Sequence, residues 1–348
     1  MKIGAVELPS PFAVAPMAGM TDTAFRRLVK RHGGCGLVVT EMVSSEGLVR
    51  GIDRTLEYAE YTEEERPVSI QVFGGDPAKM AEAARIVESM GADVVDVNMG
   101  CPVPKIAKHN AGCRLMREPA HAARVVAAMV EAVRIPVTVK MRAGWSDADR
   151  NAPLLARMVQ DNGAAAVTIH GRTAEQSYSG HADWTLVGRV ARELSIPVFG
   201  SGDCTEPEQV IDRLATGVAG VLVGRGVLRN PWILAQAADM AAGRAPRVIT
   251  LGDRGRFLLD YVALLRAECA DEARGFRHVA PGVAQPVLEA SGRERWVVNK
   301  LRALCAWYSK GLEAGSQFRV RVNSARSVPQ LRAIIEEFFL TSSALVRG

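Results

Sequence analysis

The sequence predicts an α/β fold, a (β/α)8 TIM barrel, followed by an all-helical C-terminal domain. Eight short runs of apolar, often β-branched residues recur in the first 225 of the 348 residues, and stretches with helical spacing separate them. Apolar strands that alternate with helices indicate a parallel sheet covered on both faces. Eight such units in about 225 residues match the size of this barrel. After Gly243 the pattern becomes purely helical.

The predicted strands span 12–15, 37–40, 68–73, 94–97, 137–141, 166–169, 197–199 and 220–223. Proline precedes or opens three of them, in RPVSIQV, IPVTVKM and IPVFGSG, which suits the first position of a strand. In the helical stretch PAKMAEAARIVESMG, Met80, Ala84 and Val87 fall on one face, and Gly91 marks its end. An open doubly wound sheet is the alternative, but no GxGxxG motif follows the first strand, so the barrel is favoured.

We predict a barrel domain over 1–243 and a helical domain over 244–348. The segment 243–253 is interpreted as a linker, and helices are expected over 254–273, 293–312 and within 328–339, with a loop at 274–292. Residues 241–348 carry 17 Lys+Arg and 10 Asp+Glu, whereas residues 1–240 carry 26 and 28. The formal net charge of +5 thus comes from the last third. Such a basic attachment suits a polyanionic partner, although a solvated arginine-rich surface explains the charge equally well.

The composition excludes several classes of protein. Hydrophobic residues at 48% and charged residues at 23% are typical of a globular chain, so disorder, collagen and a disulfide scaffold are excluded. No apolar run approaches the ~18 residues of a membrane span, and no signal peptide is recognised. The six cysteines form no CxxC pair, so we expect free thiols, no metal site and a cytoplasmic location. Cys113 and Cys204 are interpreted as structural, and Cys269 and Cys305 as helix core.

Polar or glycine-rich groups follow every predicted strand. In a TIM barrel the active site lies at this end, because the loops after the strands converge on one mouth. A purely structural barrel has little reason to place such groups there. In strand order they are Pro16–Met20, Glu41, Gln71 with Gly74–Gly75, Asn98 with Gly100–Pro102, Lys140 with Arg142, His170–Arg172, Gly200–Asp203 and Gly224–Gly226.

The turns after strands seven and eight predict a phosphate site. Glycine lets the backbone approach a ligand closely, and its free N–H groups can cradle a phosphate. Phosphate sites at these two strands recur in the fold, and Arg225 would add a charge-assisted hydrogen bond. One such turn alone would favour an ordinary left-handed turn. The pair favours a phosphate.

Two further side chains fit a flavin. Lys140 lies mid-strand among apolar residues, so it either extends to the mouth or meets a buried anion. Beside an isoalloxazine ring its ammonium could stabilise negative charge on the N1 side of the reduced ring. Gln71 could hydrogen-bond the ring edge. Each, taken singly, is equally compatible with a structural role.

Cys101 in NMGCPVPK is the candidate acid. Gly100 and Pro102 flank it in a loop after a strand, which favours an exposed, rigidly held thiol over a small buried hydrophobe. A thiol with an ordinary pKa of about 8.5 is protonated at neutral pH, so it can act as a general acid.

Together these motifs resemble the tRNA-dihydrouridine synthases, most closely the bacterial B-type branch. The resemblance covers nearly the whole chain. The matching stretches are APMAGMTDTAFRRL, SIQVFGGDP, DVVDVNMGCP, VTVKMRAGW, IHGRTAEQSYSG, VFGSGD, VGRGVLRNPW, LRALCAWYSKGL and QFRVRVNSA.

The resemblance implies an FMN-dependent oxidoreductase that reduces the C5–C6 bond of specific uridines in tRNA, with NADPH or NADH as electron donor. Hydride would pass from FMN N5 to C6 of uracil, and a proton from Cys101 to C5. The base must leave its stack to reach the flavin, so the helical domain is expected to clamp the tRNA. A monomer without an obligate protein partner is the simplest expectation.

The resemblance also implies roles for single residues. Those expected to bind FMN are Pro16, Met17, Ala18, Gln71, Lys140, His170, Ser201, Gly202, Asp203, Gly224 and Arg225. Those expected to contact the uracil or the RNA are Asn98, Arg142 and Arg172, beside the proton donor Cys101.

The chain departs from the family pattern at four places. Ser201 stands where the family usually has Asn, and Cys113 stands where Ser is common. Val103-Pro104-Lys105 replaces the frequent Ala-Lys-Lys, and the segment 276–296 looks longer than in the family.

Two alternative functions remain. A flavin barrel reductase for a free small molecule, such as a dihydroorotate-type substrate, would not need the basic helical domain. An RNA-binding barrel without catalysis would not need Gln71, Cys101, Lys140 and both glycine turns.

Overall fold

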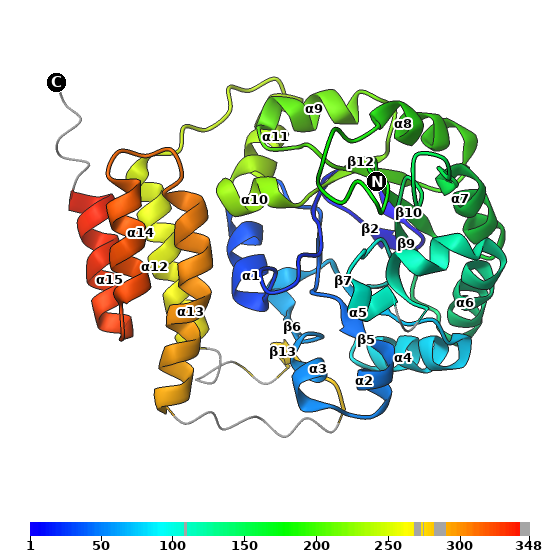
Figure 1. Cartoon of the computed structure of the whole chain (residues 1–348), viewed down its shortest axis with the longest axis horizontal. Coiled ribbons are helices and arrows are strands. Elements are labelled where there is room, and N and C mark those ends of the chain that lie inside the picture. Colours follow the sequence, from blue (N-terminus) through cyan, green and yellow to red (C-terminus); the bar gives the residue numbers. More distant parts are fainter. Residues whose placement is uncertain (108–109, 268–272, 274, 282–289, 342–348) are drawn as a thin grey trace.

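The computed structural model describes residues 1–107, 110–267, 273, 275–281 and 290–341, and its first 241 residues form the predicted TIM barrel (Figure 1). Eight parallel strands pair in the order of the chain, and β4 pairs with both β3 and β7, which closes the ring. The strands are β3 (Phe12–Val14), β4 (Leu37–Val39), β7 (Val68–Phe73), β8 (Val94–Met99), β9 (Val137–Arg142), β10 (Ala166–His170), β11 (Val198–Ser201) and β12 (Gly220–Val223).

All eight predicted strands are confirmed, and several extend further toward the barrel mouth than predicted. β8, β9, β10 and β11 each run into the polar residues that follow the apolar run. The parallel register therefore sets Asn98 beside Lys140, and His170 beside both Arg142 and Ser201. Since these pairs lie on neighbouring strands, the sheet itself brings the predicted site residues together.

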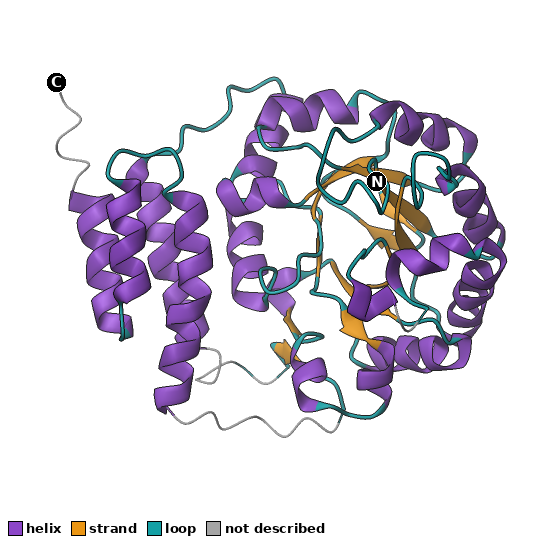
Figure 2. Ribbon diagram, viewed as in Figure 1, coloured by secondary structure: helices purple, strands orange, loops and turns teal. Residues whose placement is uncertain are grey.

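Helices cover the outside of the barrel (Figure 2). Their starts follow ordinary capping chemistry: the Asp76 side chain accepts the backbone N–H of Lys79, with a proline at the first helical position. Asp22 and Asp183 cap two other helices in the same way. The barrel helices are α1 (Thr23–His32), α4 (Pro77–Ser89), α6 (Pro119–Ala132), α7 (Ala152–Asp161), α8 (Trp184–Glu193), α9 (Pro207–Leu214), α10 (Arg225–Arg229) and α11 (Ile233–Ala241).

Short elements decorate the barrel between its main units. The hairpin β1 (Lys2–Ile3) and β2 (Val6–Glu7) precedes the first barrel strand. The long connection from β4 to β7 holds β5 (Val43–Ser44), α2 (Ser45–Val49), α3 (Asp53–Glu57), β6 (Tyr61–Thr62) and η1 (Glu63–Glu65). The loop after β8 holds α5 (Pro104–Ala107) and η2 (Gly112–Arg117).

The last third of the chain is a bundle of helices beside the barrel (Figure 1). It holds α12 (Leu251–Ala267), α13 (Ala290–Tyr308), α14 (Gly315–Ser324) and α15 (Val328–Glu336), the last continued by a π-helical turn, η3 (Glu337–Thr341). The three predicted helices overlap α12, α13 and α15; residues 268–272 of the first, including Cys269, lie outside the described residues. The chain passes from α11 to α12 through residues 242–250, the segment that holds the proposed domain boundary.

Two features of the bundle differ from the prediction. The helix α14 was not predicted, because FRVRV alternates polar and apolar residues as a strand does, and only Gly315, Phe318 and Val322 of the helix are buried. The segment predicted as a loop at 274–292 contains a short strand, β13 (Arg277–His278), that pairs antiparallel with β6, and α13 already begins within its end. The His278 ring stacks on Tyr61 at 4.5 Å between centroids. Because these two residues are more than two hundred positions apart in the chain, no local sequence pattern could predict their contact.

The bundle packs on the barrel through aromatic side chains. Phe257 of α12 stacks on His32 of α1 at 5.6 Å between ring centroids, and it meets the edges of Phe25 and Trp232 at 6.1 and 5.6 Å. Phe25 and Phe257 are almost wholly buried. Burial in this apolar contact lowers the pKa of His32 to about 4. In the described part of the chain, no helix combines the length and apolar character that crossing a bilayer requires.

Candidate functional site

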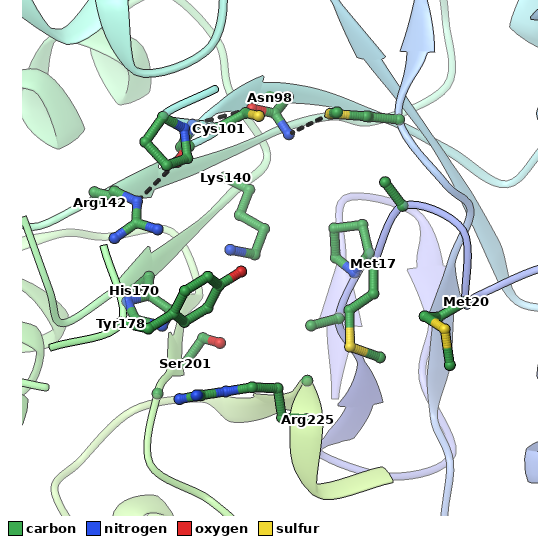
Figure 3. Close-up of a pocket in the computed structure, with 18 of the residues that line it drawn as sticks. Met17, Met20, Asn98, Cys101, Lys140, Arg142, His170, Tyr178, Ser201 and Arg225 are labelled. Carbon is green, nitrogen blue, oxygen red and sulfur yellow. Dashed lines mark hydrogen bonds between the residues drawn. The ribbon is translucent and has the colours of Figure 1, made fainter. Parts of the chain in front are cut away.

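A cavity of about 500 Å³ opens at the carboxyl ends of the barrel strands (Figure 3). Its size lies within the range of small-molecule sites. Of the fifteen residues predicted for the site, Arg172 is the one that does not line it. The others all do: Pro16, Met17, Ala18, Gln71, Asn98, Cys101, Lys140, Arg142, His170, Ser201, Gly202, Asp203, Gly224 and Arg225.

A buried chain of hydrogen bonds runs beneath the cavity. Asp96 accepts from Thr138 Oγ1 at 2.6 Å and from Gln71 Nε2 at 2.7 Å, and Gln71 Oε1 accepts from Asn98 Nδ2 at 2.7 Å. The acceptor Asp96 thereby fixes which way the Gln71 amide points, and Gln71 in turn fixes Asn98. Burial raises the pKa of Asp96, and the hydrogen bonds from Gln71 and Thr138 oppose that shift.

The loop that carries Cys101 is held from two sides. Asn98 Oδ1 accepts the backbone N–H groups of Gly100 and Cys101 at 3.1 and 2.9 Å. From the other side, Arg142 Nε donates to the Gly100 carbonyl at 2.8 Å, while its Nη1 donates to the carbonyls of Thr173 and Ser177 at 2.8 and 3.0 Å. The Cys101 backbone is therefore positioned by one side chain of its own strand and one of the next.

The thiol of Cys101 is protonated at neutral pH. Burial raises its pKa above the ordinary value, against the opposing effects of the Val103 N–H and of the positive Arg142 and Lys140. The side chain nonetheless faces the cavity, because the residue lines it and is only half-buried. A held, protonated thiol at a cavity wall can deliver a proton.

Lys140 extends into the cavity between Cys101 on one side and Arg225 on the other (Figure 3). Burial, with a smaller contribution from the positive Arg142, lowers its pKa to about 8, although Asp96 and Cys101 oppose the shift. Within the described residues no hydrogen bond to the Lys140 ammonium is found. Since a desolvated cation is stabilised by an anionic neighbour, the Lys140 ammonium favours the binding of a negatively charged group in the cavity.

His170 is a neutral imidazole in this site. Burial, together with the positive charges of Lys140, Arg142, Arg172 and Arg225, lowers its pKa to about 2. Its Nδ1 accepts the backbone N–H of Arg172 at 3.2 Å, which assigns the ring proton to Nε2. The imidazole can thus donate one hydrogen bond to a ligand. The cavity lining carries the cations Lys140, Arg142 and Arg225 and one carboxylate, Asp203, so its net charge is positive.

The turn after β11 requires glycine at position 202, and hydrogen bonds to Asp203 stabilise it on the side away from the cavity. Gly202 has φ +120°, and a Cβ there would come within 2.6 Å of the Ala182 Cβ. Asp203 accepts from the Ala182 N–H at 2.7 Å and from Arg172 Nη2 at 2.6 Å. Arg172 also donates to the carbonyls of Ser179 and Gly180 at 3.0 and 2.6 Å. The structure therefore places Arg172 behind the turn, where it braces Asp203.

Comparison with known proteins identifies the family to which this chain belongs. A family model described as dihydrouridine synthase (Dus) matches residues 13–341. The chain belongs to the dihydrouridine synthase family.

Curated relatives agree with this family assignment. A probable tRNA-dihydrouridine synthase of Rickettsia prowazekii is 36% identical over 98% of this chain and 98% of its own length. The tRNA-dihydrouridine synthase B of Xanthomonas axonopodis pv. citri is 35% identical, over 100% of this chain and 97% of its own. A probable tRNA-dihydrouridine synthase of Rhodobacter capsulatus is 44% identical over 70% of this chain and 76% of its own. The chain is thus an enzyme of this family, and the resemblance to its B-type branch is confirmed.

The cavity of this family member also has lining residues that the sequence analysis did not select. Tyr178 lies in the matching stretch IHGRTAEQSYSG, and Arg225 stacks on its ring at 4.7 Å. An exposed tyrosine within a family motif was a usable signal, whereas the other side chains look like ordinary apolar or small residues in the sequence. These further lining residues include Met42, Val103, Ser177, Thr205 and Leu228.

Proposed function

We propose that the chain reduces the C5–C6 bond of specific uridines in tRNA to 5,6-dihydrouridine, with FMN held in the cavity and NADPH or NADH as electron donor. The observation that carries the proposal is the protonated thiol of Cys101, held at the wall of the same cavity as the cations Lys140, Arg142 and Arg225. The names of the relatives support tRNA as the substrate. The alternative of a small free substrate is not favoured.

The residues of the cavity suit FMN. At one end the glycine turns and the Arg225 guanidinium provide donors for a phosphate dianion, and Gly202 leaves the backbone open there. Lys140, further along the cavity, provides a positive charge of the kind that a reduced flavin ring requires. Pro16, Met17 and Ala18 provide an apolar wall. When bound there and reduced by NAD(P)H, FMN would supply the hydride from N5 to C6 of the uracil.

Cys101 supplies the proton in this proposal. The S–H bond breaks, the proton goes to C5 of the uracil, and the electron pair stays on Sγ as a thiolate. The positive Lys140 and Arg142 lower the pKa of this thiol and therefore stabilise the thiolate. Water then returns the proton. A carboxylic acid would be ionised at neutral pH without a large shift of its pKa, so a thiol suits the step better.

The remaining predicted contacts are part of the same proposal. Asn98 and Arg142 line the cavity and hold the Cys101 loop, and in this proposal they also contact the uracil. The helical domain over 244–348 would clamp the tRNA so that the target base can leave its stack. We further propose a cytoplasmic monomer. Unpaired Cys35, Cys101, Cys113, Cys204 and Cys305 among the described residues suit a reducing compartment.

The test is an absorbance spectrum of the purified protein under anaerobic conditions. We expect a flavin band that NADPH bleaches and that unmodified tRNA restores. A flavin that bleaches but does not respond to tRNA would favour the small-molecule reductase. A colourless protein that takes up no added FMN, yet binds tRNA, would indicate an RNA-binding barrel without catalysis.

A further inference from the structure

Lys300 of α13 reaches from the helical bundle to the mouth of the barrel. Its ammonium donates to the Gly19 carbonyl at 3.0 Å and pairs with Asp22 Oδ2 at the same distance. Glu41 Oε1 lies 3.8 Å away. A second bundle residue, Tyr261 of α12, donates its hydroxyl to Asp22 Oδ2 at 2.5 Å. Two helices of the bundle thus converge on one short stretch of the barrel.

That stretch belongs to the loop after β3, which forms one wall of the cavity. Pro16, Met17 and Ala18 line the cavity directly, and Gly19 follows them. The Gly19 N–H donates to Glu41 Oε2 at 2.5 Å, while its carbonyl accepts from Lys300. The residue at the tip of the loop is therefore held on one side by the barrel and on the other by the bundle.

The charges at this junction depend on one another. The Glu41 side chain is 6% exposed, and the Lys300 side chain is 18% exposed. Burial raises the pKa of Glu41, and Lys300 is the largest opposing influence, ahead of the Gly19 N–H. A buried carboxylate that loses its cationic partner either takes up a proton or moves toward water. In either case its hydrogen bond to the Gly19 N–H, and with it the loop, would change.

We propose that Lys300 is a positioning residue for the loop at 16–21, which forms the wall of the cavity beside the proposed cofactor. Through its contacts with Gly19, Asp22 and Glu41, Lys300 makes the docked helical bundle part of the structure that shapes this loop. The bundle then does more than hold RNA, because it also sets the geometry of the flavin side of the cavity. This inference rests on the proposed function for the identity of the cofactor, and on the structure alone for the effect of Lys300 on the loop.

The test compares K300M with K300R and with K310M in the full-length protein. K300M removes the ammonium, and K300R keeps a cation of similar reach. Lys310 is an exposed residue just beyond the end of α13, so K310M removes the same charge from the bundle away from the junction. Two quantities are measured: the dissociation constant of FMN by flavin fluorescence, and hydrogen–deuterium exchange of peptides over 15–21 in FMN-free protein.

We expect K300M to weaken FMN binding by about tenfold, the equivalent of one charge-assisted hydrogen bond, and to speed exchange in the loop. K300R should recover most of both effects, and K310M should match the wild type. K300M with unchanged FMN binding and unchanged loop exchange would overturn the proposal. If K300M folds poorly, the double variant K300M/E41Q serves instead. It leaves no unpaired charge at position 41, and Asp22 keeps its hydrogen bonds from the Tyr261 hydroxyl and the Phe25 N–H, so the protein should fold and still show the faster loop exchange. Wild-type exchange in this variant would contradict the role of Lys300. The exchange measurement needs no ligand, so failure of the wild type to bind FMN would count against the proposed function alone.

Discussion

The side-chain carbonyl of Asn98 accepts the backbone N–H of Cys101 at 2.9 Å, three residues along the chain. The same amide group donates to Gln71, which is itself held by Asp96. The position of the thiol is thus linked through hydrogen bonds to a carboxylate buried below the cavity. This arrangement makes Asn98 a positioning residue for the proton donor, in addition to any contact with substrate.

Asn98→Ala is expected to lower turnover by about tenfold to a hundredfold, because two N–H groups of the Cys101 loop lose their acceptor. FMN affinity should change much less. Asn98→Asp keeps the acceptor of the two loop N–H groups, while it sets a carboxylate oxygen against Gln71 Oε1 in place of the donor. It should therefore retain more activity than the alanine variant and less than the wild type. Single-turnover rates and the alkylation rate of Cys101 would measure both effects. Equal losses in the two variants, with unaltered alkylation of Cys101, would assign Asn98 to the substrate instead of the loop.

Cys101→Ala is expected to keep FMN and to lose dihydrouridine formation by about 10² to 10⁴, the usual contribution of a general acid. Cys101 lines the cavity. In the proposed function its thiol faces the uracil, so its removal should leave the cofactor contacts in place. Cys113→Ala is the matched control, since Cys113 is buried and does not line the cavity. Dihydrouridine content of tRNA after incubation is the measurement. Normal formation by Cys101→Ala would remove this residue from the mechanism.

The strands were predictable because their signal is local. An apolar run such as that of Val137–Met141 is visible within six residues, and the polar residues after it must lie at the mouth once the sheet is closed. Fourteen of the site residues could therefore be placed before the structure was known. The helix α14 could not, because its core contacts are few and its alternation is that of a strand.

Contacts between distant parts of the chain were beyond the reach of sequence patterns. The pairing of Gln71 with Asp96 depends on the register of two strands, and the salt bridge between Arg172 and Asp203 depends on how two loops fold back. In the sequence, Arg172 is simply a cation after a strand, which fits an RNA contact as well as a structural brace. Lys300 is one basic residue among many in the helical domain until the structure places it against Gly19.

Arg225→Ala is expected to raise the dissociation constant of FMN by about tenfold to a hundredfold, since a charge-assisted contact to the phosphate is lost. Arg229→Ala provides the control. It lies on the same short helix, is half exposed, and lies 3.5 Å from Glu206 away from the cavity lining. Titration of FMN-free protein with FMN measures both variants. An unchanged dissociation constant for Arg225→Ala would contradict a phosphate at this end of the cavity.

Affinity for tRNA should fall as salt is added, because a basic domain that neutralises phosphates releases counterions on binding. The excess of Lys and Arg over residues 241–348 is the basis of this expectation. The logarithm of the association constant, plotted against the logarithm of salt concentration, should give a straight line of negative slope. FMN binding to the wild type over the same series checks that the protein remains folded. A flat response would leave the charge of the helical domain without a role in RNA binding.

Lys140 gives a prediction for the pH dependence of stability. In the folded protein its pKa is about 8, against 10.5 for an ordinary lysine, mainly because of burial. Between these two values the unfolded chain holds a proton that the folded chain has released, so stability must rise with pH over this range. Below about pH 7 both states hold the proton and the contribution is constant.

We expect the free energy of unfolding of FMN-free wild type, relative to Lys140→Met, to increase from pH 8 to pH 10. Denaturant unfolding at several pH values measures this difference, and the subtraction cancels groups that titrate alike in both proteins. Parallel pH profiles for the two proteins would show that the Lys140 amine is not desolvated in the folded cavity.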